Sequence, residues 1–349
     1  MKDLIRKIED NKLVVLTSWD IPKQFDKTDP VNLSNAIKLN HSMESIVLVD
    51  SEVPTELLEV FGDALPFNSS VKTLVLENIP NLDEKFDVIR EIITFNSGIK
   101  YLGLARNNLS CPHIEKLRKP LSINNSLEIL DLSGNLISTN GLAALARILT
   151  KTETLLELRL DNQPLGSEGF KIFLEGLEVN KSLTSLDLQN TYLDSAMVKL
   201  LAKSLIKNLW LEKLNLSNNN LGNKGVTPIL KLLEKNEKQS LNNLDLSGNG
   251  LDRYFAVFLA KIIQKNYPLR FLNLSNNCLS DLGVTIIAKA LSNHDFINGI
   301  NLNNNNVTDL GGFLLTDYIS KNNWLTEVYV KNNLFSDEFK SSLAQGKFL

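Results

Sequence analysis

Residues 127–137 read LEILDLSGNLI, and the same spacing of leucines and one asparagine returns at residues 211–221, LEKLNLSNNNL, and at residues 269–279, LRFLNLSNNCL. Such segments follow one another every 28 residues, except for a spacing of 30 in the repeat that contains the polar run 234–240. Their first positions are Met43, Val71, Ile99, Leu127, Leu155, Leu183, Leu211, Leu241, Leu269, Ile297 and Leu325. A fixed period of this length is typical of a solenoid, in which each repeat stacks on the next.

Each repeat combines two hydrophobic spacings. The Leu-x-Leu alternation in its first half predicts a short strand with one buried face. In the second half, Leu142, Leu145 and Leu149 follow helical spacing, and the same stripe recurs in later repeats. We therefore predict an α/β solenoid in which a helix follows every strand. A polar column is predicted to cap the helix starts, at Thr139, Ser167, Ser195, Asn223, Asp281, Asp309 and Asp337.

An inward-facing asparagine closes the strand motif in seven repeats. A buried amide is costly unless its donors and acceptor are bonded, so we predict a ladder of hydrogen bonds to the backbone of neighbouring repeats. The ladder residues are Asn107, Asn135, Asn219, Asn249, Asn277, Asn305 and Asn333. Gln163 and Thr191 interrupt the ladder, which predicts weaker stacking at residues 160–195, with a kink related to binding as the alternative.

The two ends of a solenoid need caps, because the end repeats would otherwise expose apolar faces. Residues 1–42 are predicted as an N-terminal cap, with an added strand at residues 13–16 and a helix that ends near Leu39. Residues 43–334 form about eleven repeats, the last of which runs into a C-terminal cap helix at residues 335–349. The alternative is that the sequence is part of a longer chain.

The 28-residue unit, with its Leu-x-x-Leu-x-Leu-x-x-Asn-x-Leu segment and a glycine at the helix start, resembles the ribonuclease-inhibitor-like class of leucine-rich repeats. The glycines are Gly141, Gly169, Gly225, Gly283 and Gly311. The resemblance implies a horseshoe with parallel strands on the concave face and helices on the convex face. It leaves the function open, because this scaffold serves inhibitors, immune sensors, GTPase-activating proteins and bacterial effectors. The abundance of Asn, Lys and Ile favours an effector that acts in a host cytosol.

Composition and charge narrow the class of partner. With 37 basic and 40 acidic residues, the chain has no strong field to attract nucleic acid or an anionic membrane. No segment reaches the length of a membrane span, and the charged start does not resemble a signal peptide. Only two cysteines occur, which fits a reducing compartment. We expect a monomer in the cytoplasm, or one secreted into a host cytosol.

Catalytic motifs are absent from the sequence. It contains no phosphate-binding Gly-x4-Gly-Lys-Ser/Thr loop, His-Glu-x-x-His zinc helix or Gly-x-Ser-x-Gly nucleophile turn. His41, His113 and His294 lie in different repeats, and each is expected to be an ordinary surface or loop residue. Cys111 stands at a helix start, where a lowered pKa is conceivable, although a small cap residue is the favoured interpretation. We expect no enzyme activity, cofactor or metal.

The predicted concave face carries mostly Asp and Asn, so departures from these residues indicate where a partner binds. Aromatic, apolar and guanidinium groups dominate binding energy at protein interfaces. The candidates form one cluster of Tyr101, Arg106, Ile129, Leu156 and Arg159 and another of Arg270, Phe271, Tyr329 and Lys331. They favour a protein partner of unknown identity. The alternatives are a GTPase-activating protein, in which Arg106 would reach a transferring phosphate, and a targeting domain of a larger protein.

Overall fold

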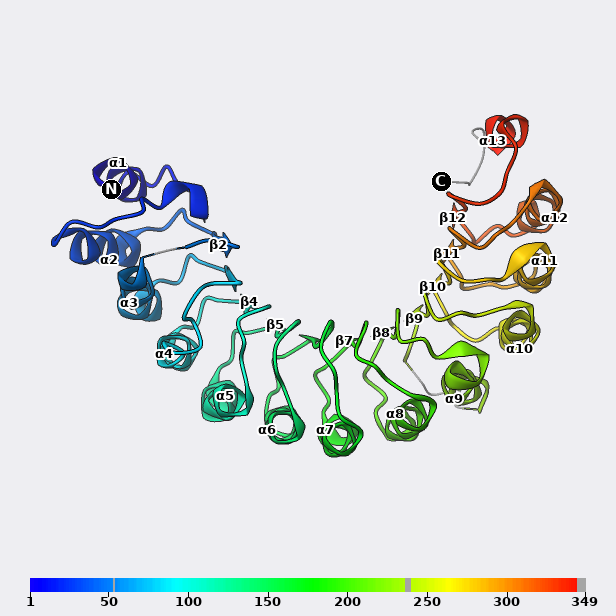
Figure 1. Ribbon diagram of the computed structural model, residues 1–349, viewed down its shortest axis with the longest axis horizontal. Helices are drawn as coiled ribbons and strands as arrows, with labels where there is room; N and C mark the ends of the chain where they lie inside the picture. Colours follow the sequence, from blue (N-terminus) through cyan, green and yellow to red (C-terminus); the bar gives the residue numbers. More distant parts are fainter. Residues whose placement is uncertain (53, 236–239, 344–349) are drawn as a thin grey trace. The chain divides into compact units, whose positions relative to one another are not determined.

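The computed structural model describes residues 1–52, 54–235 and 240–343. It divides into two compact units, Met1–Leu183 and Thr184–Leu349. Within each unit, strands and helices alternate along the chain, with the strands on one side and the helices on the other (Figure 1). The predicted α/β solenoid is confirmed.

The first unit contains six strands and seven α-helices among its described residues. They are α1 (Lys2–Glu9), β1 (Val15–Thr17), α2 (Asp29–Leu39), β2 (Ser45–Val49), α3 (Thr55–Ala64), β3 (Thr73–Glu77), α4 (Asp87–Phe95), β4 (Tyr101–Gly103), α5 (Cys111–Ile123), β5 (Ile129–Asp131), α6 (Thr139–Leu149), β6 (Glu157–Arg159) and α7 (Ser167–Val179). Two 3-10 helices, η1 (Ser18–Asp20) and η2 (Leu65–Phe67), complete this unit.

The second unit contains six strands and six α-helices among its described residues. They are β7 (Ser185–Asp187), α8 (Ser195–Lys207), β8 (Lys213–Asn215), α9 (Gly222–Lys235), β9 (Asn243–Asp245), α10 (Arg253–Gln264), β10 (Phe271–Asn273), α11 (Ser280–Leu291), β11 (Gly299–Asn301), α12 (Asp309–Ser320), β12 (Glu327–Tyr329) and α13 (Asp337–Leu343).

Neighbouring strands pair in parallel, in the register that the repeat predicts. In the first unit Leu102 pairs with Leu130, which lies 28 residues further on. In the second unit Leu214 pairs with Leu244, so the 30-residue repeat keeps the same strand register. All four leucines are at most 2% exposed. Each buried leucine of this column contributes about 1.5–3 kcal/mol of hydrophobic stabilisation.

The predicted column of helix caps is wrong by one residue at several helices. Ser138 and Asp194 are the N-cap residues of α6 and α8, and Asp194 Oδ1 accepts a hydrogen bond of 2.8 Å from the Met197 N–H. Asp281 lies in the first turn of α11 and accepts hydrogen bonds of 2.7 Å from both the N–H and the hydroxyl of Thr308. The carboxylate predicted to cap its own helix therefore links two repeats.

Both predicted caps contain secondary structure. In residues 1–42, β1 pairs with β2, α2 ends at Leu39, and α1 is a helix that the sequence analysis did not predict. After residue 335, α13 holds the buried Phe339. The Phe339 ring packs against Phe313 and Phe335, with ring centroids 4.7 and 4.9 Å apart. Residues 344–349 of the predicted cap helix lie outside the described residues.

The inward-facing asparagines bond the backbone of neighbouring repeats. Asn249 is fully buried, and its Oδ1 accepts hydrogen bonds of 3.2 Å from the N–H groups of Asn219 and Leu221. Its Nδ2 donates to the carbonyls of Leu216 and Leu246, at 3.0 and 3.2 Å. One side chain thus satisfies backbone groups of two consecutive turns.

The ladder changes at the two positions without asparagine. Gln163 is buried, and its Nε2 donates to the carbonyls of Leu132 and Leu160, both at 3.1 Å. Its Oε1 has no hydrogen-bond partner among the described residues. Thr191 keeps part of the pattern, since its hydroxyl donates to the Leu188 carbonyl at 2.7 Å. The longer glutamine side chain therefore leaves a buried acceptor unpaired, which costs stability.

A second column of buried amides, which the sequence analysis missed, lies where each helix runs into the next strand. Asn68 Oδ1 accepts hydrogen bonds from the N–H groups of Ser70 and Val71, at 3.0 and 2.9 Å. Its Nδ2 donates to the carbonyls of Ile37 and Asn40, at 2.7 and 3.0 Å. The 28-residue spacing of this column was visible in the sequence at Asn40, Asn68, Asn96, Asn124, Asn180, Asn208 and Asn322.

His294 occupies this column in its own repeat. It lies in the loop between α11 and β11, as expected, but it is buried instead of being at the surface. It is 2% exposed, and its Nδ1 accepts from the N–H groups of Phe296 and Ile297, at 3.3 and 3.1 Å. Its Nε2 lies 3.0 Å from the Tyr267 carbonyl, to which it donates when Nδ1 is the acceptor. Burial lowers the pKa of His294, although the Tyr267 carbonyl and the charge of Asp295 act in the opposite direction.

The substitution Gln163→Asn is expected to raise the free energy of unfolding by about 1 kcal/mol. The shorter amide would place its oxygen to accept from the N–H groups of Asn135 and Ile137, as Asn135 Oδ1 does from those of Asn107 and Leu109, at 3.0 and 2.9 Å. Urea denaturation measures the change. The reverse substitution, Asn135→Gln, is the matched control and should lower stability. A less stable Gln163→Asn variant would contradict this interpretation of the interrupted ladder.

Mild acid is expected to destabilise the second unit through His294. Because the folded-state pKa is lowered, the unfolded chain binds a proton more readily, and stability falls as the pH drops below about 6.5. His294→Asn keeps an acceptor and a donor in the column without a titrating group, so it should flatten the pH dependence of urea denaturation. His41→Asn, at an exposed histidine, is the control. Equal pH profiles for wild type and His294→Asn would refute the role of His294.

Candidate functional site

Five of the nine candidate residues lie on strands, on the strand face, which is the side of the sheet that faces away from the helices. They are Tyr101, Ile129, Arg159, Phe271 and Tyr329. In the first unit, Tyr101 on β4 pairs with Ile129 on β5, and Ile129 pairs with Glu157 on β6. Two positions further on, Asp131 pairs with Arg159. The short strands thus bring Tyr101, Ile129 and Arg159 together from three consecutive repeats.

Tyr101 and Arg159 form a compact polar network across these strands. The Tyr101 hydroxyl donates to Asp131 Oδ2 at 3.3 Å, and Arg159 Nη1 donates to the Tyr101 oxygen at 3.3 Å. The guanidinium carbon lies 5.6 Å from the centroid of the Tyr101 ring, and Arg159 Nε donates to Glu157 Oε1 at 2.6 Å. These contacts hold both side chains in place, so that they keep little conformational freedom.

The environment of Tyr101 keeps its phenol protonated. Burial, followed by the negative charge of Asp131, raises the pKa of Tyr101 to about 12, although the charge of Arg159 acts in the opposite direction. The half-buried ring therefore presents an apolar surface with a hydrogen-bonding hydroxyl. Such amphipathic aromatic groups are enriched in protein interfaces.

An apolar strip beside Tyr101 was missed by the sequence analysis. Val75 on β3 pairs with Val47 on β2 and with Gly103 on β4, in the column where later repeats carry mostly Asp or Asn. A Cβ on Gly103 would lie 3.0 Å from Tyr101 Cε1 and 3.3 Å from Val75 Cγ1. The missing side chain leaves room for the Tyr101 ring next to the valines. The signal was the run Val, Val, Gly in that column.

Two candidates of the first cluster lie outside this network. Leu156 is 40% exposed and immediately precedes β6. Arg106 follows the end of β4, and its guanidinium donates to Glu77 Oε1 at 2.9 Å and to Asp50 Oδ2 at 3.2 Å. A GTPase-activating mechanism would require the Arg106 guanidinium to reach a phosphate. Because the guanidinium is bonded to Glu77 and Asp50, the geometry does not favour a GTPase-activating protein.

The second cluster lies on the strand face of the second unit. Phe271 on β10 pairs with Gly299 on β11, and a Cβ on Gly299 would lie 2.6 Å from Phe271 Cδ2. The ring therefore lies across the glycine. On β12, the Tyr329 hydroxyl donates to Glu327 Oε2 at 3.0 Å. Both clusters thus place an aromatic ring over a glycine of the sheet.

The two remaining candidates flank this cluster. Arg270 is exposed and directly precedes β10, and its side chain makes no ion pair with the part of the chain that the structure describes. Lys331 is exposed two residues after β12, and its N–H donates to Asn303 Oδ1 at 2.5 Å. Both cations stand at the ends of strands, where they border the aromatic residues.

The Cys111 thiol lies at the start of α5, outside both clusters. Burial raises the pKa of the Cys111 thiol, but hydrogen bonds with Ser138 and with the backbone outweigh it and lower the pKa overall. Across residues 1–52, 54–235 and 240–343, no group of three His, Cys, Asp or Glu side chains is arranged to hold a metal ion. Within the same ranges, no helix is long and apolar enough to cross a bilayer.

Three repeats match the family model described as Leucine Rich repeat, at residues 124–146, 207–230 and 265–288. Among solved structures, the leucine-rich repeat-containing protein LegL7 from Legionella pneumophila is 19% identical, with 91% of each chain covered and a TM-score of 0.51. Actin-binding site 2 of leiomodin-1 is 23% identical over 44% of this chain and 87% of that chain, with a TM-score of 0.38. The tropomodulin C-terminal domain of Caenorhabditis elegans is 20% identical over 43% and 92%, with a TM-score of 0.36.

No curated protein matches the chain. The three matched segments and the parallel strand-and-helix repeat show that the chain contains leucine-rich repeats. The similarity to LegL7 extends over nearly the whole chain and concerns the fold alone.

A double-mutant cycle tests the network of the first cluster. Tyr101→Leu and Arg159→Gln are expected to be non-additive by about 0.5–1 kcal/mol in the free energy of unfolding, because each removes the same cation–π contact and hydrogen bond. Urea denaturation of the two single variants and the double variant gives the coupling. Tyr101→Leu with Arg106→Gln is the matched control, expected to be additive, since Arg106 bonds Asp50 and Glu77 instead. Additivity in the Tyr101–Arg159 cycle would show that the network contributes nothing.

Proposed function

We propose that this chain is a non-enzymatic scaffold that binds a folded protein on its strand face. The observation that carries this proposal is the grouping of Tyr101 with Arg159, and of Phe271 with Tyr329, on strands where other repeats carry short polar residues. Aromatic and arginine side chains contribute most of the binding energy at protein interfaces. The surrounding Asp and Asn residues supply the polar rim of such an interface.

The size of the strand face suits a protein partner. At about 4.8 Å between neighbouring strands, the six strands of one unit span about 24 Å. A standard interface needs about 800 Å² from each partner, so a protein bound here would also contact the loops at the edges of the strands. A small-molecule site would instead need a deep enclosed cavity, whereas both clusters lie on an open sheet.

The compartment is part of the same proposal. The abundance of Asn, Lys and Ile in the sequence supports a bacterial effector that acts in the cytosol of a host cell. The partner would then be a host protein. A partner in the cytoplasm of the producing cell is the alternative that the experiment must separate.

Affinity capture from a eukaryotic cytosol and from a bacterial cytosol, followed by mass spectrometry, identifies the partner, and titration with the purified partner measures affinity. The double variants Tyr101→Ala/Arg159→Ala and Phe271→Ala/Tyr329→Ala are each tested in this titration. The variant whose cluster binds the partner is expected to lose at least about tenfold in affinity, because truncating two central side chains costs about 2 kcal/mol or more.

Ser185→Ala/Lys213→Ala is the matched control, because it truncates two residues on the strand face of β7 and β8 outside both clusters. It is expected to bind as wild type does. Thermal denaturation of all variants checks that the solenoid remains folded. Unchanged affinity in both cluster variants, with the fold retained, would rule out the strand face as the binding site.

A further inference from the structure

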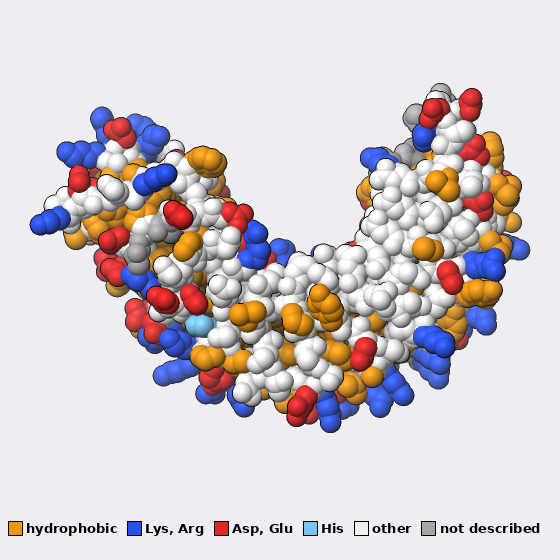
Figure 2. Space-filling model, in the orientation of Figure 1, with side chains coloured by type: hydrophobic (Ala, Val, Ile, Leu, Met, Phe, Trp, Pro, Cys, Tyr) orange, Lys and Arg blue, Asp and Glu red, His pale blue; other side chains and the backbone are white. Residues whose placement is uncertain are grey.

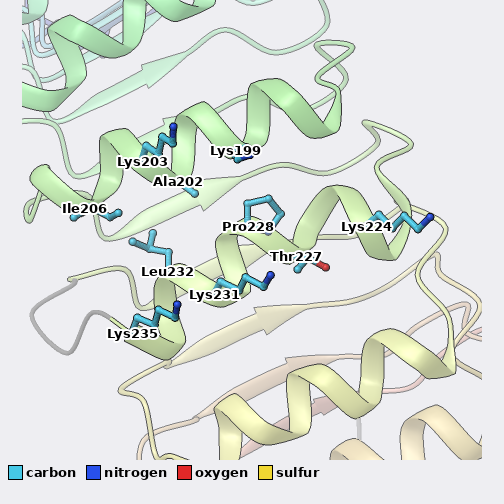
Figure 3. Close-up of a pocket in the computed structure, with 10 residues that line it drawn as sticks. All are labelled: Lys199, Ala202, Lys203, Ile206, Lys224, Thr227, Pro228, Lys231, Leu232 and Lys235. Atoms are coloured by element: carbon cyan, nitrogen blue, oxygen red, sulfur yellow. The ribbon is translucent and has the colours of Figure 1, made fainter.

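A groove lined by lysines lies on the helical side of the second unit, between α8 and α9 (Figure 3). Its volume is about 720 Å³. Figure 2 shows lysine and arginine side chains gathered along this side of the molecule. The lining residues are Lys199, Ala202, Lys203, Ile206, Lys224, Thr227, Pro228, Lys231, Leu232 and Lys235. The groove is formed by helices and is separate from the strand face.

The repeat register explains why the groove opens here. In the first unit, Gly176 of α7 packs so closely on α6 that an added Cβ would lie 2.6 Å from the Cα of Ala146. The residues 56 positions later, two repeats on, are Leu232 and Ala202, and both line the groove. A leucine in place of the glycine requires more space between the two helix backbones. The wider spacing leaves a cleft along the surface.

The floor of the groove is apolar. Ala202 and Leu232 are buried at its base, and Pro228 is partly exposed in the middle of α9. Ile206 is 56% exposed and lies near the C-terminal end of α8. These residues offer hydrophobic contact to a side chain that enters between the helices.

The rim carries five exposed lysines, Lys199, Lys203, Lys224, Lys231 and Lys235, and no acidic residue lines the groove. None of the five forms an ion pair with the residues that the structure describes. At two other gaps between neighbouring helices, a lysine is paired with a carboxylate across the gap. Lys116 bonds Asp87 at 3.0 Å and Lys265 bonds Glu234 at 3.2 Å. Among the described residues, the α8–α9 gap therefore concentrates positive charge that no acidic side chain in its lining neutralises.

We propose that this groove binds an acidic amphipathic helix of a protein partner. A helix-in-groove complex needs an apolar floor for one face of the helix and complementary charges along the rim, and α8 and α9 supply both. The 13 residues of α8 extend over about 20 Å, the length of a helix of three to four turns. Leucine or isoleucine side chains of the partner's helix would contact Ile206 and Pro228, and carboxylates of that helix would pair with the lysines.

The shape of the groove favours a helix over an anionic membrane. The buried floor at Ala202 and Leu232 lies between two helices, where a flat bilayer surface does not reach. A membrane would contact the lysines alone, without the apolar residues beneath them. The choice between the two is a direct outcome of the experiment.

A fluorescein-labelled synthetic peptide of about 14 residues, helical, with Leu on one face and Glu on the flanks, is titrated with the full chain by anisotropy. Saturable binding that weakens with added salt is expected, because the rim charges are exposed. Lys203→Glu/Lys231→Glu is expected to weaken it at least about tenfold, since two attractive contacts become repulsive. Ile206→Ala should weaken it about threefold through lost apolar contact.

The matched control is Lys261→Glu/Lys289→Glu, which reverses two exposed lysines of α10 and α11 in the same unit. It is expected to leave the affinity within about twofold of wild type. Equal weakening by this control, or equal binding of a scrambled peptide of the same composition, would overturn the proposal. So would the absence of saturable binding, or a preference for phosphatidylserine vesicles that Lys203→Glu/Lys231→Glu abolishes. The strand-face variants should bind the peptide normally, which separates this test from that of the proposed function.

Discussion

The structure depends on the need to satisfy buried backbone polar groups where the chain turns at both ends of every strand. Side-chain amides do this in two columns, because an amide can accept through its oxygen and donate through its nitrogen at the same time. Asn249 serves the turn after the strand, and Asn68 serves the turn before it. Since each amide also bonds the preceding repeat, the hydrogen bonds set the register of the stack as well as the conformation of the turn.

The same constraint explains which changes the repeat tolerates. Two extra residues between Leu214 and Leu244 leave the strand register intact. A glutamine at position 163 is more disruptive, since one extra methylene moves the carbonyl oxygen away from its partners. An imidazole succeeds at position 294 because its two nitrogens reproduce one acceptor and one donor. Position 294 is thereby sensitive to pH, unlike the asparagine positions.

The 28-residue periodicity alone predicted the strands and helices of the repeats and their order, because the same hydrophobic pattern recurs in every repeat. It did not predict the second amide column, although the 28-residue spacing was there, because asparagine near a helix end is common in single turns. It misplaced the helix caps by one residue, since Ser138 and Thr139 are both good capping types and only the backbone geometry separates them. The burial of His294 was not predicted, because the imidazole replaces the asparagine that marks this column in other repeats.

The candidate site, too, was predicted from the sequence only in part. Exposed aromatic residues stood out in the sequence against columns of Asp and Asn, but whether they form one surface depends on side-chain direction. Tyr101 and Arg159 meet because Gly103 and Asp131 lie between them in register, whereas Arg106 turns towards two carboxylates beyond the strand. Gly103 and Gly299 leave space for the rings of Tyr101 and Phe271, so these glycines also determine the shape of the strand face. Variation of this kind changes the surface while the amide columns keep the solenoid unchanged, so one scaffold can present different binding faces.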